Sequence, residues 1–298
     1  MAARRNRRGR RRNRGRFGFL YKLLSFLVIL AAILVGCIVF FRVDRIEVVG
    51  QSQYTEAEIV AASGVERGDN LFRLNKNQIA QRVLTSLPYV DKLSMSRRWP
   101  DTLVLTVSEC VPVAVVEGGG ERWLLDAACK VLERGDASLG ADRALVLGIT
   151  PLAPAVGMSL AVDEPEQQKL QSLKKLLSAL ADEGMTGSVT SFIDLSTENR
   201  IHFGYGENLT VTLPLITDFN KDIYALKKTL WRMDEDGVPR TGTLDFTVYT
   251  EGKQGALLMP ERWMPGDDAQ AAADAATAAP TAQPGGDQGA NDEDKKAQ

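Results

Sequence analysis

An uncharged apolar stretch near the N-terminus constrains this chain more than any other feature. It runs from Leu23 to Phe41 and holds 19 residues without a charge. At a rise of about 1.5 Å per residue, roughly 20 apolar residues cross the ~30 Å hydrocarbon core of a bilayer. The apolar part of a cleaved secretory signal is shorter, at ~7–15 residues, and ends at small residues, whereas this stretch ends with Phe40 and Phe41. We therefore expect an uncleaved single transmembrane helix over residues 23–41.

The charges on either side of this stretch predict its orientation. Residues 1–22 contain nine arginines, one lysine and no acidic residue, and strongly basic flanks stay in the cytoplasm. On the other flank, Arg42 and Arg45 stand beside Asp44 and Glu47. We expect a cytoplasmic basic tail and a chain whose bulk lies outside the cytoplasm. Beside a membrane span, topology and contact with anionic lipid explain such a tail, so nucleic-acid binding is not expected.

The segment that follows the span predicts a small α+β domain over residues 42–112. It opens with an alternating strand. Thr55 and Glu58 then fit a capping box at the start of a helix, which should end at Gly64. A second helix start is predicted at Asn75. Two strands with alternating apolar and polar residues complete the order β-α-α-β-β.

The tripeptide Trp99-Pro100-Asp101 connects those last two strands and also matches the acid loop of tyrosine phosphatases. Such an enzyme needs a cysteine nucleophile with an arginine six positions later. At that spacing the three cysteines are followed by Val43, Val116 and Gly135. Proline favours a turn and removes a donor from the strand ladder. We interpret the tripeptide as a connection, and a membrane-anchored phosphatase is the disfavoured alternative.

Other patterns for catalysis or metal binding are missing from the sequence. The single histidine, His202, lies in an alternating strand. No Cys/His cluster has zinc spacing, and the glycine runs lack the lysine of a phosphate-binding loop. Cys110 and Cys129 are symmetric about a glycine turn, so a regular hairpin would place them opposite one another; we hypothesise that they pair, although a turn over residues 127–130 would spoil that register. No enzyme activity, cofactor, metal or small-molecule substrate is expected.

Residues 113–266 predict a β-rich domain with two helices. Short apolar strands alternate with glycine turns. One helix carries an apolar stripe that opens near Pro165, and the other carries a stripe that begins at Phe219. Residues 267–298 hold no aromatic or β-branched aliphatic residue, so this tail is expected to be disordered.

Several motifs together resemble one protein family. They are "V.G...Y...EI....G...G.NLF.L", which ends at Leu74, then "PYV", and "R.WPDTL...V.E..PVA" from Arg97 to Ala114. The stretches "LLD" and "IDLS" to "LDFT" extend the likeness, which covers about residues 17–265. With them the chain resembles the FtsQ/DivIB family of bacterial cell-division proteins.

This resemblance implies a non-enzymatic scaffold of the divisome at the division septum, with a POTRA domain over residues 42–112 and a β domain over residues 113–266. In that family the β domain binds small coiled-coil membrane proteins of the FtsB/DivIC and FtsL types through its last strand. Carried over, the docking edge consists of Gln254, Gly255, Ala256, Leu257, Leu258 and Met259. The exposed strand of the POTRA sheet would be the one with Lys92, Ser94 and Ser96.

A POTRA-type polypeptide-binding module in protein translocation is the second alternative. Such a module would be followed by a membrane barrel. Residues 113–265 instead contain predicted helices and lack repeated lipid-facing strands of ~10 residues. The scaffold interpretation is therefore preferred.

Overall fold

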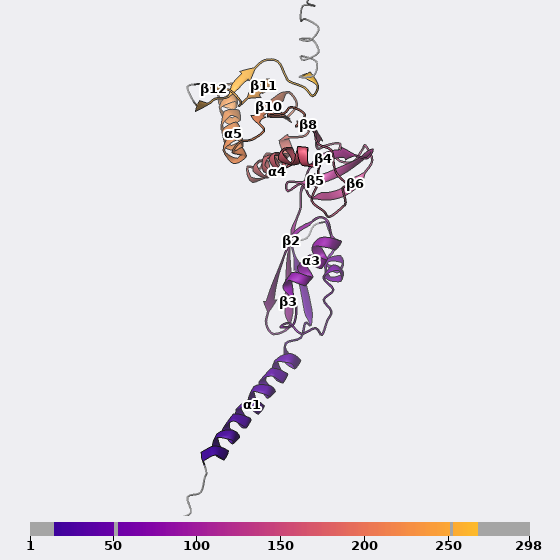
Figure 1. The fold of residues 1–298 in the computed structure, drawn as a ribbon, viewed down its shortest axis with the longest axis vertical. Helices are drawn as coiled ribbons and strands as arrows, with labels where there is room; N and C mark the ends of the chain where they lie inside the picture. The colour runs from indigo at the N-terminus through magenta and orange to yellow at the C-terminus, as the bar shows by residue number, and fades with distance from the viewer. Residues whose placement is uncertain (1–14, 51–52, 251–252, 268–298) are drawn as a thin grey trace, which may run out of the picture. The chain divides into compact units, whose positions relative to one another are not determined.

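The computed structural model of the chain describes residues 15–50, 53–250 and 253–267 (Figure 1). Most of the predicted basic tail and nearly all of the predicted C-terminal tail lie outside the described residues. The chain separates into two compact units, one drawn from Met1–Leu145 and Thr150–Gly187 and the other from Val146–Ile149 and Ser188–Gln298. Helices and strands occur in both units, which confirms the predicted α+β class.

The first unit begins with a single long helix, α1, Gly15–Phe40. Its stretch Gly18–Cys37 is long and apolar enough to cross a membrane, and none of it is buried. Because a lone apolar helix without protein contacts would expose its side chains to water, lipid is its natural surrounding. The helix thus fits a single-pass membrane anchor, as the sequence predicts.

A three-stranded sheet with two helices follows α1. Its elements are β1 (Arg45–Val49), α2 (Glu56–Ser63), α3 (Lys76–Ser86), β2 (Val90–Arg98) and β3 (Thr102–Glu109). The strand order is β1-β3-β2, with β1 parallel and β2 antiparallel to the central β3. The predicted order β-α-α-β-β is therefore confirmed.

Local hydrogen bonds explain why α2 and α3 start where they do. The backbone N–H of Thr55 donates to Oε2 of Glu58 at 2.8 Å, and the N–H of Glu58 donates to Oγ1 of Thr55 at 3.3 Å. These bonds form the predicted capping box. The N–H of Thr55, together with its hydroxyl at 2.7 Å, donates to the Glu58 carboxyl and lowers the pKa of that group. Gly64 ends α2 with a φ of 64°, and the Asn75 side chain caps α3. The predicted helix limits are confirmed.

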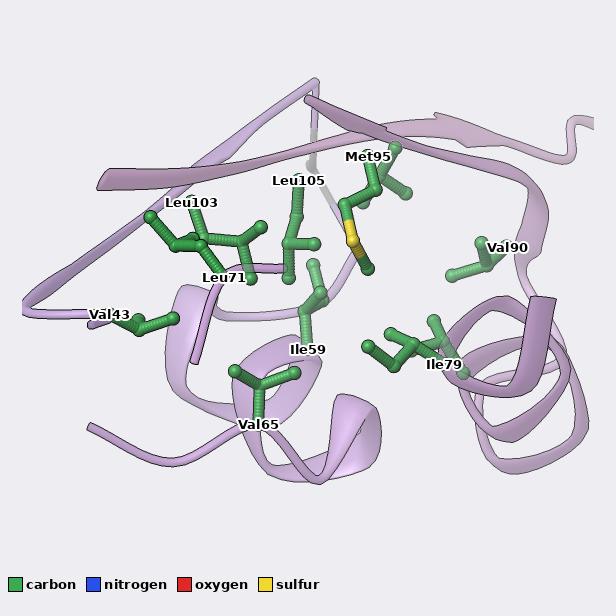
Figure 2. Packing of buried hydrophobic residues seen from close by; sticks show 11 residues of the cluster. Val43, Ile59, Val65, Leu71, Ile79, Val90, Met95, Leu103 and Leu105 are labelled. Atoms are coloured by element: carbon green, nitrogen blue, oxygen red, sulfur yellow. The ribbon is translucent and has the colours of Figure 1, made fainter. Parts of the chain in front are cut away.

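Apolar side chains fill the space between the three-stranded sheet and its two helices (Figure 2). Leu103 and Leu105 reach from β3, Met95 from β2, Ile59 from α2 and Ile79 from α3, and all five are buried. Burying such a side chain contributes roughly 1.5–3 kcal/mol relative to leaving it exposed. This core fixes the sheet, so both edge strands have defined positions.

The predicted turn at Trp99-Pro100-Asp101 joins β2 to β3 and closes one end of the sheet. The carbonyl oxygen of Asp101 accepts from the backbone N–H of Asp44 at 2.9 Å and of Arg45 at 3.3 Å. Its carboxylate accepts from the hydroxyl of Thr102 at 2.9 Å. The tripeptide is thus a strand connection that also ties down the start of β1.

The rest of the first unit consists of three antiparallel strands and one long helix. Its elements are β4 (Pro112–Gly118), β5 (Glu121–Asp126), β6 (Val131–Gly135), the 3₁₀ turns η1 (Glu164–Glu166) and η2 (Thr186–Ser188), and α4 (Gln167–Asp182). Gly119 and Gly120 turn β4 into β5 with positive φ values of 65° and 81°. The predicted domain boundary between residues 112 and 113 lies inside the first unit. The division into a POTRA domain and a β domain at this position stays a prediction.

The described part of the second unit contains a main sheet, a two-stranded hairpin and one helix. Its elements are β8 (Phe192–Asp194), β9 (Arg200–Tyr205), β10 (Leu209–Pro214), α5 (Phe219–Glu235), β11 (Gly242–Asp245), β12 (Tyr249–Thr250), β13 (Lys253–Gln254) and β14 (Leu257–Met259), while β7 (Ala144–Leu147) is drawn from both units. The strand order β8-β9-β10-β11-β14 ends at β14. Because β10 and β11 are parallel, α5 makes the crossover between them.

Candidate protein-binding strands

β14 is the end strand of the second unit's sheet. It pairs antiparallel with β11, with Leu258 opposite Leu244, and no other described strand pairs with it. Leu257, Leu258 and Met259 are 48%, 37% and 37% exposed. An edge strand presents a row of backbone donors and acceptors to which an extended segment of another protein adds. An apolar edge of this kind is suited to binding a strand.

Two buried threonines anchor the segment that follows β14. The hydroxyl of Thr243 donates to the carbonyl of Glu261 at 2.8 Å and accepts from the N–H of Trp263 at 2.8 Å. The hydroxyl of Thr210 donates to the carbonyl of Trp263 at 2.8 Å. The Trp263 ring stacks on His202 with 3.8 Å between ring centroids. These contacts hold the chain close to β10 and β11, which keeps β14 at the sheet edge.

Gly242, at the start of β11, allows the backbone of β14 to approach closely. Its φ is 94°, and a Cβ added there would lie 2.1 Å from the carbonyl oxygen of Met259. Only glycine avoids both the strained backbone and the overlap. Sequence reasoning missed Gly242, Thr243 and Trp263. The sequence offered a single pattern that could have found them: Gly242 comes before one of the last two apolar strands, and Trp263 comes after the other.

The predicted docking segment is divided in the structure. Gln254 lies in β13, which forms a two-stranded hairpin with β12. The N–H of Gly255 donates to the carbonyl of Val248 at 2.9 Å, and Ala256 is exposed between the two strands. Leu257 begins β14, so the strand edge is shorter than the predicted six residues. The binding role of all six residues stays a prediction.

The second predicted surface is an edge of the three-stranded sheet. β2 lies at the end of the order β1-β3-β2, and Lys92, Ser94 and Ser96 are exposed on it. The ladder has an irregularity between Val90 and Lys92, and such a bulge together with polar side chains discourages unspecific pairing. This edge is more polar than β14, and its role in binding also stays a prediction.

The two side chains considered above for catalysis, Asp101 and His202, form hydrogen bonds within the fold. The Asp101 carboxylate accepts from Thr102, as described above. Nδ1 of His202 lies 3.0 Å from Oγ1 of Thr212, inside the sheet core. Among the described residues, no group of three or more His, Cys, Asp or Glu side chains is arranged to hold a metal ion. The geometry favours contact through strand edges.

Cys110 and Cys129 are both free and buried, so the hypothesised disulfide is wrong. The turn between β5 and β6 explains the outcome. The Asp126 carboxylate accepts from the N–H of Ala128 at 2.9 Å and of Lys130 at 2.7 Å, and Cys129 has a φ of 57°. Burial, then Asp126, raises the pKa of Cys110 to about 12, and burial raises the pKa of Cys129 to about 12.

Both thiols are expected to resist alkylation in the folded protein. Only the thiolate attacks, and its fraction falls tenfold for each unit by which the pKa rises, so iodoacetamide at about pH 8 should react on the order of a thousandfold more slowly than with the unfolded chain. The rate should increase as the pH approaches the raised pKa values. Peptide mass spectrometry on a Cys37→Ala background measures this, with the denatured chain as control. Rapid labelling of the folded protein would contradict the prediction.

Three cell-division proteins illustrate which known sequences this chain is similar to. FtsQ of Streptomyces venezuelae is 36% identical over 88 residues, covering 30% of this chain and 32% of that protein. FtsQ of Geobacter sp. strain M21 is 31% identical over 180 residues, covering 60% of each. DivIB of Clostridium tetani is 23% identical over 199 residues, covering 66% of this chain and 72% of that protein. The chain therefore spans less than two thirds of the length of the first two relatives.

A family model matches one part of the chain. Residues 41–109, which contain the three-stranded sheet, match the model described as "POTRA domain, FtsQ-type". A solved structure, the major extracytoplasmic domain of the trans isomer of DivIB from Geobacillus stearothermophilus, is similar with 13% identity and a TM-score of 0.27, covering 43% of this chain and 98% of that one. Residues 41–109 thus match an FtsQ-type POTRA domain, and the chain is similar to FtsQ and DivIB cell-division proteins.

Proposed function

We propose that this chain is a bitopic membrane scaffold of the bacterial divisome, which recruits and regulates septal cell-wall synthesis by binding other proteins and without catalysis. α1 supplies an anchor of membrane-spanning length. The basic residues that precede it favour a cytoplasmic N-terminus. Its relatives are named as cell-division proteins. The second unit and the part of the first unit that follows α1 would then lie outside the cytoplasm, at the division septum.

The observation that carries the binding proposal is the exposed apolar edge of β14. Backbone groups on its outer side would pair with an extended segment of a partner, and Leu257 to Met259 would pack against the partner's side chains. The proposed partners are small coiled-coil membrane proteins of the FtsB/DivIC and FtsL types. Residues 254–259 form the proposed docking segment, and the β2 edge with Lys92, Ser94 and Ser96 is the proposed second surface.

Depletion of the protein tests the proposed function in cells. Loss of a divisome scaffold should produce filaments, and a fluorescent fusion that restores division should gather at midcell. A chain in which an unrelated apolar span replaces α1 is the control, because it keeps the anchor and removes any sequence-specific contact of the helix. Normal division after depletion, together with a uniform membrane signal of the fusion, would overturn the proposal.

A further inference from the structure

Three aromatic rings gather where the first unit's chain leaves α1. Phe41, Phe72 and Trp99 form an aromatic cluster, with centroid distances of 5.2 Å between Phe41 and Phe72, 5.0 Å between Phe41 and Trp99, and 5.1 Å between Phe72 and Trp99. They come from the end of the span, the α2–α3 loop and the β2–β3 connection. Phe72 and Trp99 are each 52% exposed. Large aromatic rings that pack together and yet remain half exposed form an apolar patch, and such patches mark sites that contact a protein or a membrane.

Backbone and side-chain bonds tie the aromatic cluster to the end of the apolar span. Phe41 directly follows the last residue of α1. The N–H of Leu71 donates to the carbonyl of Phe41 at 3.0 Å, and Nδ2 of Asn70 donates to the carbonyl of Cys37 at 3.5 Å. Cys37 closes the membrane-length stretch of α1, so Phe41 follows the end of that stretch by four residues, about one helical turn or ~6 Å. Aromatic residues are enriched at the membrane–water interface, where the hydrocarbon core lies on one side and water on the other.

A polar groove opens beside the aromatic cluster. It has a volume of about 420 Å³ and is lined by Arg42, Gly68, Asp69, Asn70, Arg73 and Leu74. Within the described residues, neither Arg42 nor Arg73 takes part in an ion pair. The one carboxylate in the groove, that of Asp69, accepts from the N–H of Glu66 at 3.0 Å. Two guanidinium groups against one carboxylate favour an anion, and guanidinium matches phosphate geometry.

We propose that the aromatic cluster docks into the outer interface of the bilayer and that the groove between Arg42 and Arg73 holds the phosphate of a phospholipid headgroup. The lipid is assigned because the cluster is covalently continuous with the membrane-length helix. The inference rests on the proposed membrane insertion of α1 and is independent of partner binding. Docking would hold the three-stranded sheet against the membrane and limit its swing about the end of the span.

Tryptophan quenching tests the aromatic contact on the full chain. The protein is reconstituted into phosphatidylcholine vesicles whose acyl chains are brominated near the headgroup, with unbrominated vesicles as reference. Bromine should quench the wild-type fluorescence, and Trp99→Phe should remove most of that quenching. Trp231→Phe is the matched control, since Trp231 is also exposed, at 60%, and should leave the quenching unchanged. Quenching that is equal in the wild type and in Trp99→Phe would overturn the docking.

Anionic lipid tests the groove. Adding phosphatidylglycerol should increase the quenching of Trp99, and the double variant Arg42→Gln, Arg73→Gln should lose that increase. Lys76→Gln is the control, because Lys76 is exposed and lies outside the groove. An increase that persists in the double variant would overturn the headgroup assignment. Extraction with alkaline carbonate is run in parallel: a chain that is extracted has lost the anchor itself, whereas a retained chain without Trp99 quenching has lost only the docking.

Discussion

Leu257→Lys is expected to weaken binding of the proposed coiled-coil partner on the order of thirtyfold, which corresponds to roughly 2 kcal/mol. Leu257 is 48% exposed on the proposed docking edge, so a bound segment would bury the new ammonium group without a partner across the interface. Within the sheet the change is mild, because Leu257 stands opposite Asp245 and a cross-strand pair of opposite charges is favourable. Binding of the purified partner to full-length protein in detergent, by titration calorimetry, measures the loss.

Ile216→Lys is the matched control for this prediction. Ile216 is an aliphatic residue of the same unit, 72% exposed, and it lies outside β14. The same charge placed there should leave the affinity unchanged and should show that added positive charge alone does not repel the partner. Equal affinities of the wild type and Leu257→Lys, with the strand still formed, would remove β14 from the proposed site.

Short-range rules predicted the first sheet domain because each of its elements is signalled by its own residues. Thr55, Glu58 and Gly64 limit α2 through bonds that span a few positions, and Asn75 does the same for α3. The alternation in β2 and β3 follows from one buried face. The connection at Trp99-Pro100-Asp101 was likewise predictable from its proline.

Contacts between distant segments were not predictable in this way. The stacking of Trp263 on His202 joins residues from β9 and from the chain after β14, and no local pattern encodes it. The split of residues 254–259 into β13 and β14 depends on which strand each half meets. The same applies to Phe41, Phe72 and Trp99, which only the fold brings together.

The proposed docking edge requires β14 to be held firmly by its own sheet. In the proposed binding mode Leu257 to Met259 remain free on one side while β11 pairs with the other. The hydrogen bonds of Thr210 and Thr243 hold the chain that directly follows β14. A binding edge can be positioned only as firmly as the strand that bears it. The close approach of β14 to β11 is therefore the structural condition for the proposed partner binding.

Gly242→Ala is expected to destabilise the second unit by about 3 kcal/mol and to release β14. A left-handed backbone costs an alanine roughly 1–2 kcal/mol, and the rest comes from the overlap of its Cβ with the carbonyl oxygen of Met259, 2.1 Å away.

Gly237→Ala isolates the first cost, because Gly237 has a φ of 68° and nothing lies within 4 Å of the added Cβ. Urea unfolding of both variants gives the difference. Hydrogen exchange should show faster exchange of residues 257–259 in Gly242→Ala alone, and partner affinity should fall with it. If the two variants lose equal stability and β14 stays protected, the tight pairing of β14 with β11 does not hold the docking edge in place.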